Sequence, residues 1–235
     1  IIVPLAKPVI VSGIILVSPF TDAKSKGLLK RSGVPLLYAL NPDRDGRVPS
    51  VVFDETAAAR ELLQSALMAG GNRGTRGVVI LAGDERESST ARRVKGFCEG
   101  VAKAGTEAPR LLYGANSIDQ GYEAVRELLR EGAPGLLAAT TDYLAVAANR
   151  AAYDAGISVS RPMSVLGFGE NSHSHTATPK IGTARLDARL MGERCGKTIK
   201  LLMEGGSPER LQVLGFELVP GESCPLSPST SGEDV

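Results

Sequence analysis

Residues 77–104 read GVVILAGDERESSTARRVKGFCEGVAKA, and this stretch decides the fold class. The run from Val78 to Leu81 is apolar and rich in β-branched residues, which is typical of a strand buried on both faces. Residues 88–104 then carry apolar side chains at helical spacing. A buried strand followed by a helix is the repeating unit of parallel sheets with crossover helices. The stretch therefore predicts an α/β protein.

The same alternation continues in both directions along the chain. We expect strands at residues 13–17, 35–38, 50–53, 78–81, 110–113, 135–138, 164–167 and 212–218. We expect helices at residues 21–31, 55–70, 88–104, 118–130, 143–155 and 187–204. Two successive series of this kind predict two similar lobes, each a parallel sheet flanked by helices. In such folds ligands bind outside the carboxyl ends of the strands, here in a cleft between the lobes.

The late helix and strand suggest that the chain crosses between the lobes more than once. We assign residues 1–53 and 188–214 to the N-terminal lobe. Residues 54–187 and 215–223 form the C-terminal lobe. Residues 224–235 are rich in Pro and Ser, and we expect a disordered tail there.

Composition excludes several classes of function. The 27 basic and 26 acidic residues leave a net charge of +1, which gives no strong field for nucleic acid or an anionic membrane. No apolar run approaches the ~18 residues of a membrane span. Cys98, Cys195 and Cys224 are scattered and lack a Cys-x-x-Cys motif. We therefore expect reduced thiols in a cytoplasmic protein, with no metal site and no cofactor.

The alternating His173, Ser174 and His175 could suggest a metal site or a catalytic feature. No third ligand lies at a suitable spacing in the sequence. We interpret this segment as a polar surface loop.

Ten short motifs occur in order between Gly13 and Gly221, and together they resemble the effector domain of LacI/GalR transcription regulators. That domain shares its fold with periplasmic sugar-binding proteins. The motifs are Gly13–Pro19, Gly33–Leu37, Ser50–Asp54, Leu81–Gly83, Arg93–Phe97, Gly121–Tyr122, Thr141–Ala145, Ser164–Phe168, Thr183–Asp187 and Met191–Gly192.

The resemblance implies a sensing domain and not an enzyme. A small carbohydrate-like effector would control operator binding allosterically in a homodimer, and DNA would be contacted only through an N-terminal helix-turn-helix headpiece that this chain lacks. The alternative is a periplasmic solute-binding protein of a sugar transporter. A doubly wound enzyme would need an acid/base or nucleophile set, and we find none.

One region departs from the family pattern. Ile1–Leu5 looks like the first strand of the effector domain, yet only a few residues separate it from the strand at Gly13. A crossover connection needs at least about a dozen residues. We therefore expect that residues are missing between about Leu5 and Val9.

The resemblance also implies the site residues. Arg93 matches a position whose guanidinium hydrogen-bonds the effector, although Arg92 and Lys95 beside it also fit a solvated helix face. Phe53 would either cover the effector with its ring or pack at a hinge. Thr141 and Asp142 replace the usual Asn-Asp pair. Asp142 fits helix capping better than ligand binding, and Thr141 is the better ligand candidate.

The remaining expected effector contacts are Ser18, Ser89, Asn116 and Gly169, of which Ser89 could instead cap its helix. Family members that bind neutral sugars commonly carry Asp where this chain has Leu40 and Gly169. Loss of two carboxylates beside Arg93 favours an anionic effector, such as a sugar phosphate or a sugar acid. An inward-pointing Glu170 would reverse that preference.

Overall fold

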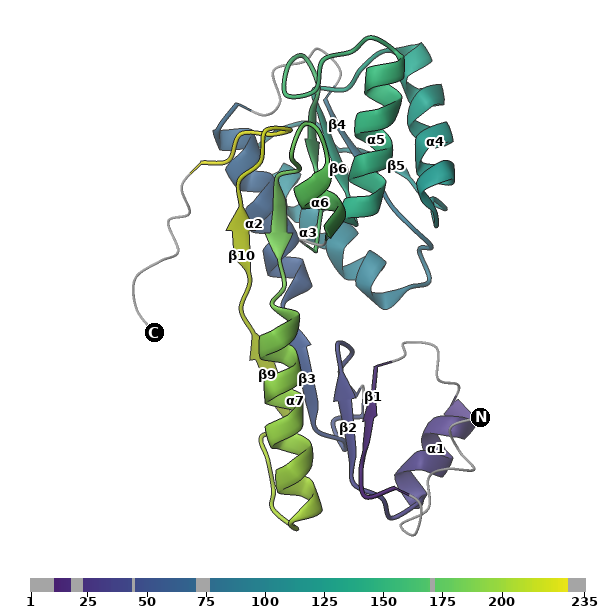
Figure 1. Ribbon diagram of the computed structural model, residues 1–235, viewed down its shortest axis with the longest axis vertical. Coiled ribbons are helices and arrows are strands. Elements are labelled where there is room, and N and C mark those ends of the chain that lie inside the picture. The colour runs from purple at the N-terminus through teal and green to yellow at the C-terminus, as the bar shows by residue number, and fades with distance from the viewer. Residues whose placement is uncertain (1–10, 18–22, 44, 71–76, 170–171, 228–235) are drawn as a thin grey trace. The chain divides into compact units, whose positions relative to one another are not determined.

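The computed structural model describes residues 11–17, 23–43, 45–70, 77–169 and 172–227. The chain divides into two compact units, shown in Figure 1. Unit 1 comprises residues 1–54 and 187–215, and unit 2 comprises residues 55–186 and 216–235. The stretch from Leu5 to Val9, where we expect missing residues, lies outside the described residues, as does Ser18.

Unit 1 is built on a four-stranded parallel sheet with the order β1-β2-β3-β9. Leu29 packs in one apolar cluster with Leu36 and Tyr38 of the sheet, while helix α7 contacts the first three strands. The elements of unit 1 are β1 (Ile14–Leu16), α1 (Ala23–Arg31), β2 (Leu36–Ala39), β3 (Ser50–Phe53), α7 (Ala188–Met203) and β9 (Leu211–Leu214).

Unit 2 contains a second four-stranded parallel sheet with the order β5-β4-β6-β7. Its strands are β4 (Val78–Leu81), β5 (Arg110–Leu112), β6 (Leu136–Ala139) and β7 (Ser164–Leu166). Its helices are α2 (Glu55–Met68), α3 (Ser88–Lys103), α4 (Ile118–Glu131), α5 (Asp142–Asp154) and the short α6 (Ser172–Thr176).

The surroundings of strand β4 explain why its sequence is continuously apolar. Val78 and Ile80 belong to the apolar cluster that includes side chains of α2 and α3. Val79 and Leu81 belong to a different cluster, formed with α4 and α5. Successive strand side chains point to opposite faces, so helices on both faces bury all four residues. The predicted α/β class, with parallel sheets flanked by helices, is confirmed (Figure 1).

The single strand expected at residues 212–218 is wrong. Strand β9 ends at Leu214, and β10 (Glu217–Val219) pairs antiparallel with β8 (Thr183–Arg185) in a separate two-stranded sheet. The chain passes from unit 1 to unit 2 after Gly215, so one sequence run serves two sheets. The loop expected around His173 and His175 is also wrong, because these residues lie in α6.

The disordered tail predicted for residues 224–235 is wrong for residues 224–227, which the structure describes. Cys224 is fully buried, and Leu226 packs against the α2–α3 side of the core of unit 2. Ser65 of α2 donates its hydroxyl to the carbonyl of Ser227 at 2.9 Å and accepts from the Ser227 amide through its own carbonyl. The segment 224–227 therefore covers α2 and satisfies a buried serine. Residues 228–235 lie outside the described residues.

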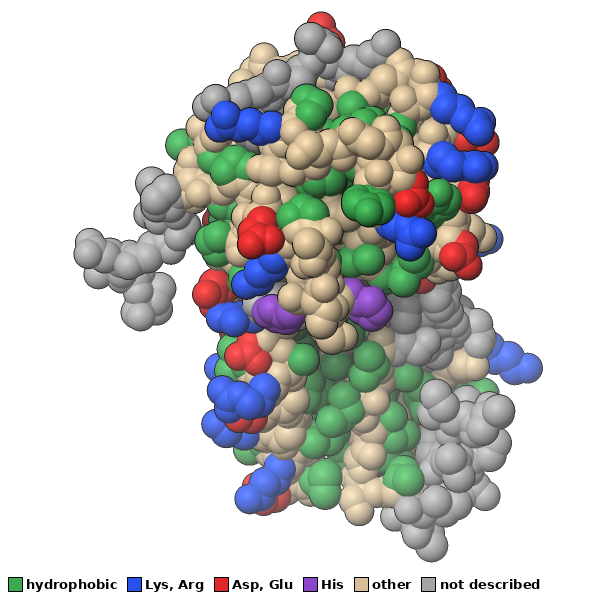
Figure 2. Space-filling model, turned by 45° about the horizontal axis from the view of Figure 1, so that its top comes forward, with side chains coloured by type: hydrophobic (Ala, Val, Ile, Leu, Met, Phe, Trp, Pro, Cys, Tyr) green, Lys and Arg blue, Asp and Glu red, His purple; other side chains and the backbone are tan. Residues whose placement is uncertain are grey.

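Charged side chains of both signs lie interspersed over the described residues of the face in Figure 2. This distribution agrees with the near-zero net charge of the whole sequence. Across the described parts of the chain, we find no helix that is long and apolar enough to cross a membrane.

Candidate functional site

Arg93 of α3 lies at the carboxyl end of β6 in unit 2. Its Nη1 donates to the carbonyl oxygen of Thr140 at 2.8 Å, directly after the last residue of that strand. Its Nε and Nη2 both donate to Oε1 of Glu55, at 2.8 and 2.5 Å. The Arg93 side chain is only 17% exposed. A solvated helix face, which was the alternative for this residue, is therefore wrong.

The other carboxylate oxygen of Glu55 accepts hydrogen bonds from a second arginine. Arg92 donates through Nε and Nη2 to Oε2 of Glu55, at 2.8 and 2.5 Å. The Glu55 side chain is 7% exposed, so this carboxylate is buried between two guanidinium groups. Neighbouring residues of one helix do not normally face each other. Arg92 and Arg93 converge because both reach the first residue of α2.

An aromatic ring supports the guanidinium of Arg93. The Cζ atom of Arg93 lies 4.5 Å from the centroid of the Phe168 ring, which is the geometry of a cation–π contact. Phe97 in turn meets Phe168 edge-to-face, with centroids 6.3 Å apart. Both rings are almost completely buried, so the ring beneath Arg93 is held in place by the core. We call Glu55, Arg92, Arg93, Thr140 and Phe168 the Arg93 cluster.

Close packing of α3 on α2 makes this cluster possible. A Cβ atom added to Gly96 would lie 2.3 Å from the backbone oxygen of Thr56, and one added to Gly100 would lie 2.9 Å from that of Arg60. Only glycine permits so close an approach of the two backbones. The glycine within the Arg93–Phe97 motif therefore brings Arg93 within reach of Glu55.

Two threonines follow β6 at the same edge of the sheet. The side-chain oxygens of Thr140 and Thr141 are both enclosed, and neither has a hydrogen-bond partner. Thr141 is the N-cap residue of α5, yet its side chain makes no capping bond. An enclosed hydroxyl without a partner costs free energy. Neither hydroxyl is therefore used in a hydrogen bond within the described protein.

Asp142 has a different role from the one expected. Helix α5 is capped at Thr141, so capping by Asp142 is wrong. Asp142 is fully buried and accepts a hydrogen bond from the Thr183 hydroxyl at 2.7 Å, while its amide donates to the carbonyl of Phe168. The residue thus connects α5 to β8 and to the segment after β7.

The other predicted contacts are distributed over both units. Ser89 lies in the first turn of α3, and because Glu87 is the N-cap of that helix, the capping role for Ser89 is wrong. Asn116 is exposed in the loop after β5. Phe53 is 5% exposed in β3 of unit 1, where it is in register with Leu214.

Gly169 and Leu40 stand at the two positions where sugar-binding family members commonly carry Asp, and backbone geometry accounts for the glycine. Gly169 has a φ of 122°, a conformation that favours glycine, and its amide donates to the carbonyl of Ala184. Leu40 has a φ of 67° although it carries a side chain, and it is 39% exposed after β2 of unit 1. Asn and Asp tolerate this left-handed region better than leucine does. The backbone conformation explains why residue 169 is glycine. At position 40 the backbone has a conformation that is strained for leucine.

Asn116 lines a hollow of about 360 Å³ at the carboxyl ends of β4 and β5. Asp84, Arg86 and Tyr113 also contribute to it. The Arg86 guanidinium binds both oxygens of Asp84 and lowers the pKa of that carboxyl to about 2. The hollow therefore holds the ion pair of Asp84 with an exposed Arg86, a second acidic residue, Glu85, and the neutral amide of Asn116.

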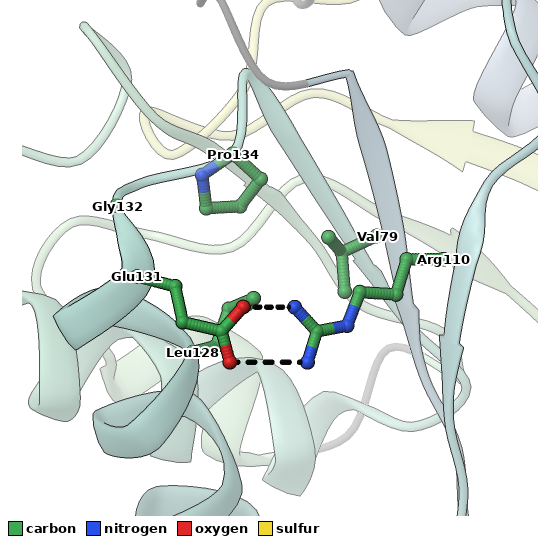
Figure 3. A pocket seen from close by; sticks show the side chains of 6 residues that line it. All are labelled: Val79, Arg110, Leu128, Glu131, Gly132 and Pro134. Atoms are coloured by element: carbon green, nitrogen blue, oxygen red, sulfur yellow. Dashed lines mark hydrogen bonds and ion pairs between the residues drawn. The ribbon is translucent and has the colours of Figure 1, made fainter.

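A smaller hollow, of about 90 Å³, lies at the opposite edge of the sheet (Figure 3). Arg110, at the start of β5, forms a two-pronged ion pair with Glu131 at the end of α4, and the pair lies beside Val79, Leu128 and Pro134. Its volume corresponds to about three water molecules. This hollow therefore lacks the room that a sugar-sized ligand needs.

Within residues 11–17, 23–43, 45–70, 77–169 and 172–227 there is no group of three or more His, Cys, Asp or Glu residues that could hold a metal ion. His173 and His175 are exposed on α6.

Several members of the site were missed by sequence reasoning. Glu55 and Thr140 were not expected to take part, and Phe168 was noted only as part of a motif. Glu55 lies 38 positions before Arg93, and no spacing rule connects the two. A charged residue at the start of a helix gives no local signal that it will be buried.

Two units built on parallel sheets, with polar groups at the carboxyl ends of the strands, define a periplasmic-binding-protein-like α/β protein. The chain belongs to the family described as periplasmic binding proteins and sugar binding domain of the LacI family, whose model matches residues 9–211. The family membership that the ten motifs predicted is confirmed.

Curated relatives of this chain are transcription regulators. The chain is 28% identical to the HTH-type transcriptional regulator CelR of Thermobifida fusca, over 91% of this chain and 63% of the relative. It is 27% identical to catabolite control protein A of Priestia megaterium, over 73% of this chain and 52% of the relative. The chain therefore spans about half to just under two thirds of the curated relatives that it matches.

Solved structures agree with this assignment. A complex of the regulator CelR with cellobiose superposes with a TM-score of 0.81 at 26% identity, covering 91% of this chain and 66% of that one. A lac repressor dimer bound to operator and an anti-inducer gives a TM-score of 0.78 at 23% identity, covering 91% and 73%. The second likeness supports the fold alone.

Proposed function

We propose that this chain is the effector-sensing domain of a LacI/GalR-type transcription regulator. A small carbohydrate-like molecule binds at the Arg93 cluster and controls operator binding allosterically. The observation that carries this proposal is the fixed guanidinium of Arg93 at the carboxyl end of β6, beside the unpartnered hydroxyls of Thr140 and Thr141. In α/β folds of this kind, ligands bind outside the carboxyl ends of the strands.

The chemistry of the cluster suits an oxygen-rich ligand. Contacts within the protein use three of the five N–H groups of Arg93, which leaves two donors for a ligand. The hydroxyl of Thr141 can both donate and accept. Hydroxyl, carboxylate and phosphate oxygens all match this set of groups.

We propose that the effector is anionic, such as a sugar phosphate or a sugar acid. The cluster contains two guanidinium groups and one carboxylate, so it has a charge of about +1. The solved CelR complex contains cellobiose, a neutral sugar. The affinity of this chain for an anionic ligand should therefore be compared with its affinity for cellobiose. Charge at the cluster favours an anion over a neutral sugar of equal size.

A ligand screen tests the proposal. Melting temperature would be measured with neutral sugars, sugar phosphates, sugar acids and nucleosides, because a ligand that binds only the folded state raises it. Calorimetry would then give the affinity of each hit for wild type and for Arg93→Ala. We expect affinity to fall about 10- to 100-fold, which corresponds to a charged hydrogen bond of about 1.5–3 kcal/mol.

Arg189→Ala is the matched control, because that arginine is 77% exposed and pairs only locally, with Glu193, on α7. It should leave the affinity unchanged. Unchanged affinity in Arg93→Ala, or a screen without any hit, would contradict the proposal.

We further propose that the protein acts as a homodimer without catalytic activity, and that operator DNA is contacted by a helix-turn-helix headpiece of a longer protein. The solved lac repressor that shares this fold is a dimer, and that comparison motivates the first point. Analytical ultracentrifugation over a wide concentration range would test it. A monomer at every concentration would instead favour the alternative, a component of a sugar transporter.

A further inference from the structure

Glu55 engages both of its oxygens, one with each arginine. Each guanidinium approaches through Nε and Nη2, and the carboxylate is almost completely buried. Removal of either oxygen from its arginine would leave a buried charge unpaired, which is costly. The carboxylate is therefore fixed in place as a counter-ion of the cluster.

This arrangement changes what Arg93 can offer to a ligand. The Nε–Nη2 edge of a guanidinium is one that binds carboxylates and phosphates with two parallel hydrogen bonds. In Arg93 that edge is occupied by Glu55, and Nη1 is bonded to the Thr140 carbonyl. The remaining donors belong to Nη1 and Nη2, and the Glu55 carboxylate, which Arg93 shares with Arg92, compensates only part of the Arg93 charge.

We infer that Glu55 is the specificity-determining residue of this site: it positions Arg93 over Phe168 and limits the affinity of the site for strongly charged anions. The inference rests on the proposed function in taking Arg93 as the ligand contact. Loss of the carboxylate would raise the charge of the cluster from about +1 to about +2 and free the occupied edge of Arg93. The site would then bind a free anion such as phosphate more tightly.

The experiment uses inorganic phosphate as an anionic probe and methyl glucoside as a neutral one, with ionic strength held constant by chloride. Apparent affinities come from the rise in melting temperature with ligand concentration. Glu55→Gln keeps the size of the side chain but removes its charge. We expect phosphate to bind at least about tenfold more tightly than in wild type, while binding of methyl glucoside does not improve.

Three further variants separate specificity from structure. Glu55→Asp keeps the charge and should keep the phosphate affinity near that of wild type. Glu127→Gln removes an exposed charge on α4 and should have no effect on either probe. Adding Arg93→Ala to Glu55→Gln should abolish the gain in phosphate affinity, because the guanidinium that glutamine no longer neutralises is lost.

If Glu55→Gln does not fold, as judged by circular dichroism, the double variant Glu55→Gln with Arg92→Gln replaces it. That variant removes one charge of each sign, so the cluster keeps a charge of about +1 and has one uncompensated guanidinium, that of Arg93, instead of two. It should also bind phosphate more tightly than wild type. Phosphate affinity equal to or below that of wild type in a folded variant overturns the inference.

The two proposals can fail separately. The phosphate assay does not require the effector, so a gain in phosphate affinity can occur even if the ligand screen finds no effector. Conversely, an effector can bind through Arg93 while Glu55→Gln leaves the charge preference unchanged. The first result would reject sensing alone, and the second would reject the role of Glu55 alone.

Discussion

One carboxylate oxygen of Glu55 accepts hydrogen bonds from both Nε and Nη2 of Arg93, 38 positions away in the chain. The contact ties the first residue of α2 to α3 and orients the guanidinium across Phe168. Glu55 is also the first residue of unit 2 after the chain leaves unit 1 at Asp54. A single buried side chain thus determines the local geometry of the candidate site.

Truncation of Glu55 should destabilise the protein. Glu55→Ala leaves Arg92 and Arg93 facing a site without a counter-ion, and we expect the free energy of unfolding to fall by about 3 kcal/mol. Urea denaturation followed by circular dichroism measures the change. A loss below about 0.5 kcal/mol, typical of an exposed ion pair, would show that the cluster is open to solvent.

The contact between α2 and α3 should not tolerate a methyl group at Gly96. Gly96→Ala places a Cβ atom 2.3 Å from the Thr56 carbonyl, so the helices must separate, at a cost of about 2–4 kcal/mol. Gly196→Ala is the control, because its Cβ on α7 would meet nothing within 4 Å. That variant should gain up to about 1 kcal/mol from helix propensity. Equal effects of the two substitutions in thermal unfolding would contradict this prediction.

The strained backbone at Leu40 should be relieved by asparagine. Leu40→Asn keeps the φ of 67° with a residue that tolerates it, so we expect a gain of about 1 kcal/mol in unfolding free energy. Leu28→Asn provides the comparison, since Leu28 is exposed to a similar extent but lies in helix α1. There asparagine should destabilise slightly. Destabilisation by both substitutions would mean that Leu40 contributes through packing and not through strain.

Burial of Cys224 should make stability sensitive to alkaline pH. Desolvation raises the pKa of this thiol from the ordinary 9.0 to about 12. Above pH 9 the unfolded chain releases the proton while the folded protein retains it, so the contribution to stability, complete below pH 9, declines up to about pH 12. The loss approaches about 1.4 kcal/mol per pH unit.

Urea denaturation of wild type and Cys224→Ala at several pH values from 8 to 11 isolates this effect. The difference between the two proteins cancels the titration of lysines and tyrosines. We expect wild type to lose more unfolding free energy than Cys224→Ala as the pH rises. A constant difference would indicate that Cys224 is accessible to solvent in the folded protein.

The sequence alone was sufficient to determine the four strands of the parallel sheet of unit 2, and the helices α2 to α5, to within a few residues. The reason is that each buried strand, such as Val78–Leu81, has helices on both faces and therefore an apolar run that is visible in the sequence. Arg93 could also be selected from its motif. These features depend on neighbouring residues, so a linear pattern records them.

Only the tertiary structure decided how the site is assembled. It showed the ion pair of Glu55 with Arg93, the hydroxyls of Thr140 and Thr141 without hydrogen-bond partners, and Cys224 buried in the core of unit 2. It also divided residues 212–218 between two sheets. Each of these features joins residues that are distant in the sequence. Burial and pairing of such residues depend on the packing of whole elements, which no local spacing encodes.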